Sequence, residues 1–86
     1  MANIASQEKR IHRAERERIE NRRRTSQVKT WFRRLESAVA DGDAERADQE
    51  LRELVSHVDL AVKSGAMHRN SGARRKSRAA RIRARL

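Results

Sequence analysis

Two groups of cationic side chains in this sequence have the spacing and the chemistry to bind anions. The last twenty residues, 67–86, hold eight Lys and Arg and no acidic residue, and a second group, NRRRT, occupies residues 21–25. In the whole chain, 18 of the 22 cationic side chains are Arg. The planar guanidinium binds two phosphate oxygens at once and stacks on flat bases. These residues therefore indicate binding to a polyanion.

The distribution of charge along the chain points to the same kind of partner. Residues 1–34 hold 11 cationic and 4 acidic side chains, residues 35–63 hold 3 and 8, and residues 64–86 hold 8 and none. The formal net charge is +10 and the sequence pI is about 11.6. A basic chain of this kind favours nucleic acid as its partner. The acidic middle segment is expected to neutralise part of the two basic segments that flank it.

The elements that carry these charges are predicted to be helices. The 86 residues include no Pro and only three Gly, and they are rich in residues that favour helices. Asp41-Gly42-Asp43 and Ser64-Gly65 have the composition of a helix end followed by a new helix start. The sequence thus predicts one all-α domain over residues 1–86, with helices at about 6–40, 43–63 and 68–85.

Apolar residues recur every three or four positions in parts of all three predicted helices, as they do on the buried side of a helix. They predict a three-helix bundle. The expected core residues are Val28, Phe32, Leu35 and Val39, then Ala47, Leu51, Leu54, Val55, Val58, Ala61 and Val62, and finally Ala73, Ala79, Ile82 and Leu86. Trp31 is expected to belong to the core, with stacking on a base as the alternative.

The first half of the first helix has no such pattern. Between residues 5 and 27 the large apolar residues are Ile11 and Ile19 alone. A helix that is polar on all sides has no face to bury, so this half is predicted to project from the bundle by roughly 30 Å. Ion pairs of Glu15 and Glu20 with Arg three or four residues away are expected to support it. Without a polyanionic partner, this half and the last helix are expected to fray.

The sequence lacks the residues that several other functions require. The sequence has no Cys, its three His lie on separate segments, and Asp41-Gly42-Asp43 lacks the ligand series of a calcium loop, so no metal site or cofactor is predicted. No Gly-rich phosphate loop, nucleophile elbow or carboxylate pair indicates an enzyme or a small-molecule substrate. No apolar stretch approaches the roughly 20 residues that span a bilayer, and no secretory signal is recognised, so no membrane role is predicted.

Alternative interpretations of the basic segments remain open. NRRRT resembles the basic region of a leucine-zipper DNA-binding protein, but the heptads of Leu that a zipper needs are absent. The other candidates are a nucleoid-type DNA-binding protein, a protein-interaction bundle, and a basic surface that contacts only solvent. His12 and His68 are candidates either for RNA contact or for simple exposure.

Two longer motifs narrow these alternatives. MANIASQEKR at residues 1–10 and MHRNSGARRKS at 67–77, together with ADGD at 40–43 and KSG at 63–65, resemble the bacterial small-subunit ribosomal protein family called S-twenty. The resemblance implies a non-catalytic, cytoplasmic three-helix protein of the ribosome. Such a protein binds 16S ribosomal RNA directly and early in assembly, near the bottom of the body of the small ribosomal subunit, and stabilises its folded helices.

The candidate RNA-binding residues come from two sources. By motif position, the resemblance implies Asn3, Ser6, Lys9, Arg10, His68, Arg69, Asn70, Lys76 and Ser77. Charge and expected exposure add Arg13, Arg16, Arg22, Arg23, Arg24, Lys29, Arg33, Arg34, Arg74, Arg75, Arg78 and Arg81.

Overall fold

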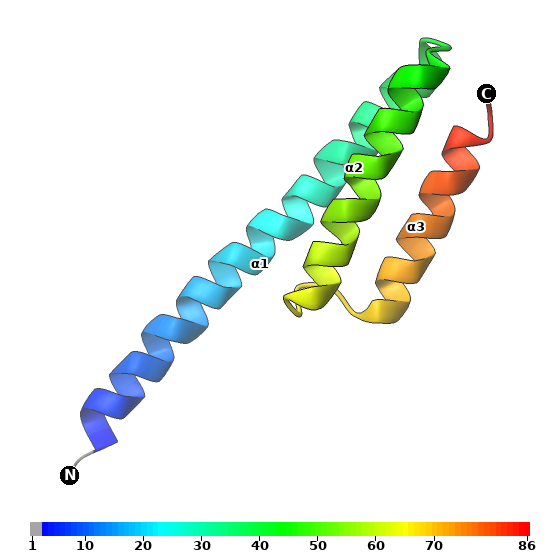
Figure 1. The fold of residues 1–86 in the computed structure, drawn as a ribbon. Coiled ribbons are helices and arrows are strands. Elements are labelled where there is room, and N and C mark those ends of the chain that lie inside the picture. Colours follow the sequence, from blue (N-terminus) through cyan, green and yellow to red (C-terminus); the bar gives the residue numbers. More distant parts are fainter. Residues whose placement is uncertain (1–2) are drawn as a thin grey trace.

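The computed structural model describes residues 3–86, which form three helices joined by two short turns (Figure 1). The helices are α1 (Asn3–Ala40), α2 (Ala44–Lys63) and α3 (Arg69–Arg83). The prediction of an all-α, three-helix fold is confirmed. Compared with the predicted boundaries, α1 begins three residues earlier and α3 ends two residues earlier. Asp43 and His68 stand just before α2 and α3, as capping residues rather than as helical ones.

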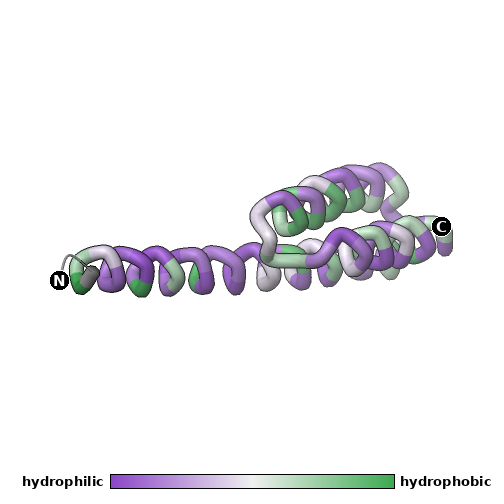
Figure 2. Tube along the Cα trace, turned by 90° about the horizontal axis from the view of Figure 1, so that it is seen from below, coloured by the Kyte–Doolittle hydropathy of each residue, from purple (hydrophilic) through white to green (hydrophobic). Residues whose placement is uncertain are grey.

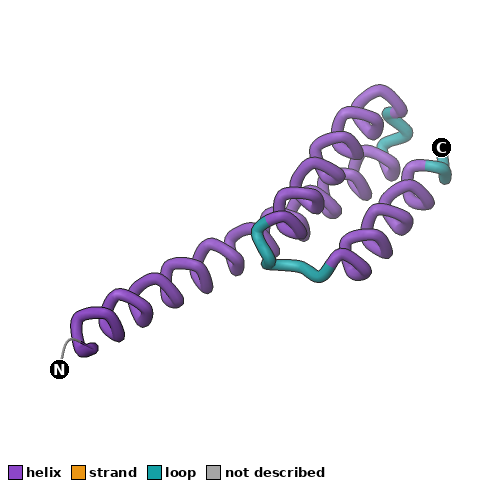
Figure 3. The backbone as a smooth tube through the Cα atoms, turned by 60° about the horizontal axis from the view of Figure 1, so that its bottom comes forward, coloured by secondary structure: helices purple, strands orange, loops and turns teal. Residues whose placement is uncertain are grey.

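Local chemistry explains where the helices end (Figure 3). Gly42 and Gly65 have φ angles of 69° and 81°, in the left-handed region that glycine adopts without strain. The side chain of Asp43 accepts a hydrogen bond from the backbone N–H of Arg46 at 3.1 Å, which satisfies a free donor at the start of α2. The predicted stop and restart at each turn are therefore present.

The core lies where α2 packs between α1 and α3. Leu35 and Leu54 are fully buried at its centre. The buried apolar residues are Val28, Phe32, Leu35 and Ala38 from α1, Ala47, Leu54, Val58 and Ala61 from α2, Met67 from the second turn, and Ala79 and Ile82 from α3. The predicted core residues Val39, Leu51, Val55 and Val62 lie at its edge and are half-buried. Trp31 is likewise half-buried and packs against the core.

The prediction for α3 was wrong at two core positions. Ala73 and Leu86 are exposed, and Gly72 is buried instead. A Cβ atom at Gly72 would lie 2.6 Å from Cγ2 of Val62, which is closer than van der Waals contact allows. The missing side chain therefore lets α3 approach α2 closely. This approach turns the neighbouring Ala73 toward solvent, since adjacent residues on a helix point about 100° apart.

The first half of α1 projects from the bundle, as predicted (Figures 1 and 2). Every residue from 4 to 20 is exposed, and we call this segment the arm. It makes the molecule long and thin, with principal extents of 63 × 21 × 13 Å. The expected fraying of the arm and of α3 without RNA stays a prediction, which circular dichroism with and without RNA tests.

The structure modifies one smaller expectation. Within the described part of the arm, the ion pair that forms joins Arg13 to Glu17 at 3.2 Å, rather than joining Glu15 or Glu20 to a neighbouring Arg. Across residues 3–86, no helix is both long enough and apolar enough to cross a membrane.

Candidate nucleic-acid interface

One side of the arm collects cationic side chains. Lys9, Arg16 and Arg23 recur every seven residues, so they lie on the same side of α1, and Arg13 lies next to them. All four side chains are exposed. We call these four residues the basic side of the arm; Arg23 lies three residues beyond the arm and continues its row of cations toward the bundle. Arg13 is already paired with Glu17, so the other three hold the charge that is available to a phosphate chain, and exposed Glu20 on the same side offsets part of it.

A second cationic surface runs along the line where α1 and α3 meet. The Arg78 guanidinium lies 5.3 Å from the centroid of the Phe32 ring, and its Nη2 lies 3.9 Å from Oε1 of Glu36. These contacts place Arg78 against α1. Residues three and four positions apart share a side of a helix, so other charged side chains line the same junction. The resulting seam surface consists of Lys29, Arg33 and Glu36 from α1 and Arg74, Arg78 and Arg81 from α3, all exposed.

The seam surface faces away from α2. In Figure 2, α1 and α3 overlap along one side of the bundle and α2 lies on the other. Five cations and one anion therefore lie on the side where the acidic helix does not cover them. Sequence reasoning selected all five of these cations, and the structure brings them together from two helices.

Helix α2 supplies counter-charge to the other side of α3. Lys76 Nζ lies 2.8 Å from Oδ1 of Asp59, and Arg83 Nε lies 2.5 Å from Oδ1 of Asp48. The hydrogen bond from Arg83 lowers the pKa of the Asp48 carboxyl below its ordinary value; desolvation opposes this shift, and the charges of Arg83 and Arg52 add to it. Acidic α2 thus neutralises part of α3, as its composition indicated. Lys76, a predicted RNA contact, is half-buried and already paired.

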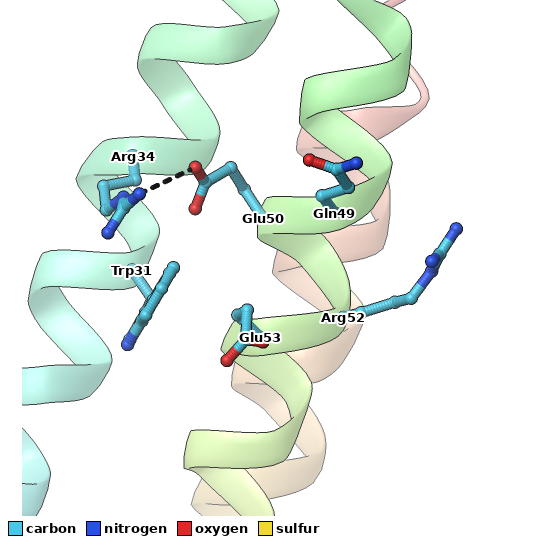
Figure 4. Close-up of a pocket in the computed structure, with 6 residues that line it drawn as sticks. All are labelled: Trp31, Arg34, Gln49, Glu50, Arg52 and Glu53. Carbon is cyan, nitrogen blue, oxygen red and sulfur yellow. Dashed lines mark ion pairs between the residues drawn. The ribbon is translucent and has the colours of Figure 1, made fainter.

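Arg34 belongs to a third environment, a groove of about 330 Å³ between α1 and α2 (Figure 4). Its Nη2 lies 3.2 Å from Oε1 of Glu50, which is only 7% exposed. Its guanidinium also lies 4.3 Å from the centroid of the Trp31 ring. His57 stacks on the Trp31 ring with centroids 5.2 Å apart and planes inclined by 18°. Trp31 therefore already stacks on two neighbours of its own chain, and Arg34 neutralises a buried carboxylate.

His68 has a structural role that its motif did not reveal. Its Nδ1 accepts a hydrogen bond from the backbone N–H of Asn70 at 3.1 Å, so the side chain caps the N-terminus of α3. A histidine that serves as an N-cap lacks a strong sequence signal, because Ser, Thr, Asp and Asn are the usual residues there. The His68 side chain is nevertheless exposed at the start of the basic helix, beside Arg69.

The remaining predicted RNA contacts differ in how exposed their side chains are. Arg24 and Arg75 are half-buried, like Lys76. The side chain of Asn3 lies outside the described residues. Exposed side chains belong to Ser6, Lys9, Arg10, Arg13, Arg16, Arg22, Arg23, Lys29, Arg33, Arg34, His68, Arg69, Asn70, Arg74, Ser77, Arg78 and Arg81. Sequence reasoning omitted the exposed cations Arg18 and Arg85, although the same charge argument applies to both.

Within residues 3–86, no three His, Asp or Glu side chains come together in a way that could hold a metal ion.

Comparison with known proteins identifies the family. Residues 2–83 match the family described as Ribosomal protein S20. A relative from Acaryochloris marina, named small ribosomal subunit protein bS20, is 43% identical over 89 residues, which cover 95% of each chain. A relative of the same name from Frankia casuarinae is 44% identical over 86 residues, which cover all of this chain and 97% of the relative. The chain therefore belongs to the Ribosomal protein S20 family, which is a family of structural ribosomal proteins and not of enzymes.

Proposed function

We propose that this chain is a structural constituent of the small ribosomal subunit that binds 16S ribosomal RNA directly and stabilises its folded helices during assembly. Its family supports the ribosomal role, in the bacterial cytoplasm. The observation that carries the RNA contact is the arrangement of charge. Cations lie on the basic side of the arm and on the seam surface, while Asp48, Glu50 and Asp59 of α2 pair with Arg83, Arg34 and Lys76 on other sides of the bundle.

The mechanism is electrostatic and geometric. Each Lys or Arg that contacts a phosphate releases a condensed counterion, which makes binding favourable and sensitive to salt. The tip of the arm, near Lys9, and the seam surface lie at different places along an elongated molecule, so we expect them to contact separate stretches of RNA. A rigid protein that holds two RNA segments at a fixed spacing stabilises the RNA conformation in which they have that spacing.

The ion pairs between α2 and α3 prepare the seam surface for this contact. Arg74, Arg78 and Arg81 repel one another on a single helix. Asp48 and Asp59 offset this repulsion from the opposite side of α3 through Arg83 and Lys76. These ion pairs favour the helical form of α3, and the fraying expected of it without RNA stays a prediction.

A salt titration of RNA binding tests the proposal. We expect the affinity for a 16S ribosomal RNA fragment to fall by roughly 10³ to 10⁵ between 50 and 200 mM salt if about six to ten phosphates are contacted, judged on the scale for duplex DNA. The Arg33→Gln/Arg81→Gln variant should bind more weakly and should lower the salt slope by about 2, because each lost phosphate contact lowers it by about 1.

The matched control removes the same charge from another surface. Arg52 and Lys63 are exposed on α2, away from the seam, so Arg52→Gln/Lys63→Gln should leave the salt slope nearly unchanged. Equal losses in the two variants would show that net charge alone matters and would contradict the proposed surface. Equal affinity for random duplex DNA would instead favour a nucleoid-type role, and failure of the protein to sediment with the small subunit would exclude the ribosomal one.

A further inference from the structure

The groove between α1 and α2 contains a buried acceptor that the chain itself leaves without a donor. Glu50 is 7% exposed, and its Oε1 pairs with Arg34. Its Oε2 is also buried and, among residues 3–86, has no hydrogen-bond partner. In Figure 4 this second oxygen points toward the space between Trp31 and Glu53. A buried acceptor without a donor costs free energy, so a ligand that brings an N–H group to this oxygen is stabilised there.

The α1 side of the groove offers a ligand a flat surface that is held in place. The Arg34 guanidinium lies 4.3 Å from the centroid of the Trp31 ring, and its Nη2 lies 3.2 Å from Oε1 of Glu50. His57 stacks on the same ring. The Arg34 side chain is nevertheless 54% exposed. A planar guanidinium fixed in this way can stack on a nucleobase, as Arg does where proteins bind unpaired RNA bases.

The charges that line the groove select neither an anion nor a cation. Two cations and two anions are present, and they belong to Arg34, Arg52, Glu50 and Glu53. Arg46, about one helical turn before Glu50, is paired with Asp41, with Nη1 and Oδ2 3.0 Å apart. The two carboxylates of the groove repel a phosphate, and its two guanidinium groups repel a Lys or Arg of another protein. The lining therefore suits a neutral ligand with N–H donors.

We propose that this groove binds one unpaired guanine base of 16S ribosomal RNA. The inference rests on the proposed function and deepens it, because it adds a contact with one kind of base to the phosphate contacts of the two basic surfaces. Guanine is flat and neutral, and its Watson–Crick edge presents two adjacent donors, N1–H and the N2 amino group. The base stacks on Arg34 and donates from this edge to Oε2 of Glu50.

The other bases match the groove less well. Adenine and cytosine each carry an amino group beside a ring nitrogen that accepts hydrogen bonds, and uracil has a single donor between two carbonyl groups. Each of them therefore turns at least one acceptor toward the carboxylate of Glu50, where the lone pairs repel one another. The two adjacent donors of guanine avoid this repulsion.

The size and the rim of the groove are compatible with a single base. A volume of about 330 Å³ lies at the lower end of the range for small-molecule sites. Because Oε2 of Glu50 is buried, a base reaches it only after side chains at the rim move aside. Gln49 is exposed and the side chain of Glu53 is 56% exposed, so both can rotate into solvent. Neither belongs to the core, so the groove can open while the bundle stays folded.

The fluorescence of Trp31, the single tryptophan of the chain, measures this binding directly. The probes are short uridine RNAs of equal length with guanosine, inosine or uridine at the centre. They carry the same number of phosphates, so the basic surfaces bind them equally. Inosine lacks the N2 amino group and therefore tests the paired donors. The guanosine RNA should bind at least about fivefold more tightly than the other two, the lower limit for discrimination by a good bidentate contact.

Two variants and a control assign this preference to the groove. Arg34→Lys keeps the charge and removes the flat guanidinium, so it should lose the preference for guanosine and bind the uridine RNA as before. Arg33→Lys makes the same change on the seam surface and should keep the preference. Glu50→Gln should bind the guanosine and inosine RNAs equally. Because Glu50 is buried, circular dichroism first establishes that this variant is folded; Arg34 is exposed, so Arg34→Lys keeps the test decisive if it is not.

Several outcomes would overturn the inference. Equal affinity for the three RNAs, or an unchanged guanosine preference in Arg34→Lys, would show that no guanine binds in the groove. A photoreactive residue at position 49, on the rim, should cross-link to RNA in reconstituted small subunits, and a cross-link to a protein instead would contradict the proposal. These results leave the phosphate contacts of the basic surfaces intact. Failure of the unaltered chain to bind a 16S ribosomal RNA fragment would instead refute the proposed function.

Discussion

The arm and the bundle are two parts of one molecule that are stabilised in different ways. The bundle buries eleven apolar residues in one cluster, and its acidic helix α2 pairs with the cations of α3. The arm buries none of its side chains and is held by backbone hydrogen bonds and local contacts such as the Arg13–Glu17 pair. The difference teaches that α1 supports the core with its second half, while its first half is a helix that no other part of the described bundle covers.

Shortening one side chain in each region tests this contrast. The substitution in the core should have the largest effect on the free energy of unfolding. Leu54 is fully buried, so Leu54→Ala should lower the free energy of unfolding by about 2 to 5 kcal/mol. Ile11→Ala in the arm should change it by less than about 0.5 kcal/mol, because the side chain is exposed. Thermal unfolding followed by circular dichroism measures both. A similar loss in the two variants would show that the arm is part of the cooperative core.

A substitution at the close contact between α3 and α2 should have a smaller effect on the free energy of unfolding. Gly72→Ala places a methyl group 2.6 Å from Cγ2 of Val62, a β-branched side chain with few rotamers in a helix. We expect a loss of about 1 to 3 kcal/mol in the free energy of unfolding, measured by urea denaturation.

A second substitution shows whether the predicted clash is the cause. Val62→Ala removes the atom that would collide with the new methyl group. The double variant Gly72→Ala/Val62→Ala should therefore recover part of the stability lost in Gly72→Ala. Val55→Ala is the matched control, because Val55 is also a half-buried valine of α2. Equal recovery from both second substitutions would contradict the clash.

Removing the ion pair between Arg83 and Asp48 should have the smallest effect on stability, and this effect should depend on pH. The folded-state pKa of Asp48 lies below its unfolded value, so the pair contributes stability above the unfolded pKa and loses it as the pH falls through the folded pKa. Asp48→Asn should remove this part of the acid dependence and leave the rest unchanged. Thermal unfolding between pH 2 and 7 measures the difference. Curves that stay parallel throughout would show that Asp48 is not paired in solution.

The sequence predicted the helices and the basic surfaces for reasons that act locally. Straight-chain residues, the absence of Pro, and the Gly42 and Gly65 turns determine where helices begin and end. The exposure of the seam cations followed from charge and periodicity, which are visible in the sequence, and their contact with RNA stays a prediction.

The features that the sequence did not predict depend on how the helices meet. The rotation of α3 that buries Gly72 and exposes Ala73 follows from the space next to Val62 on another helix. The pairing of Arg34 with buried Glu50 and the capping by His68 are also set by tertiary placement. A pattern of period 3.6 predicts which side of a helix is buried. It does not specify which residues of the other helices pack against that side.

The continuity of α1 has a consequence for ribosome assembly. Its 38 residues run from the tip of the arm to the far end of the bundle with no Gly or Pro between them. A helix of this kind bends little, so the distance between its two contact regions is set by the number of residues and not by the RNA. Inserting or deleting one residue in the arm would also rotate its tip by about 100° relative to the bundle. Under the proposed function, the length of α1 therefore sets the spacing between the two parts of the RNA that it contacts.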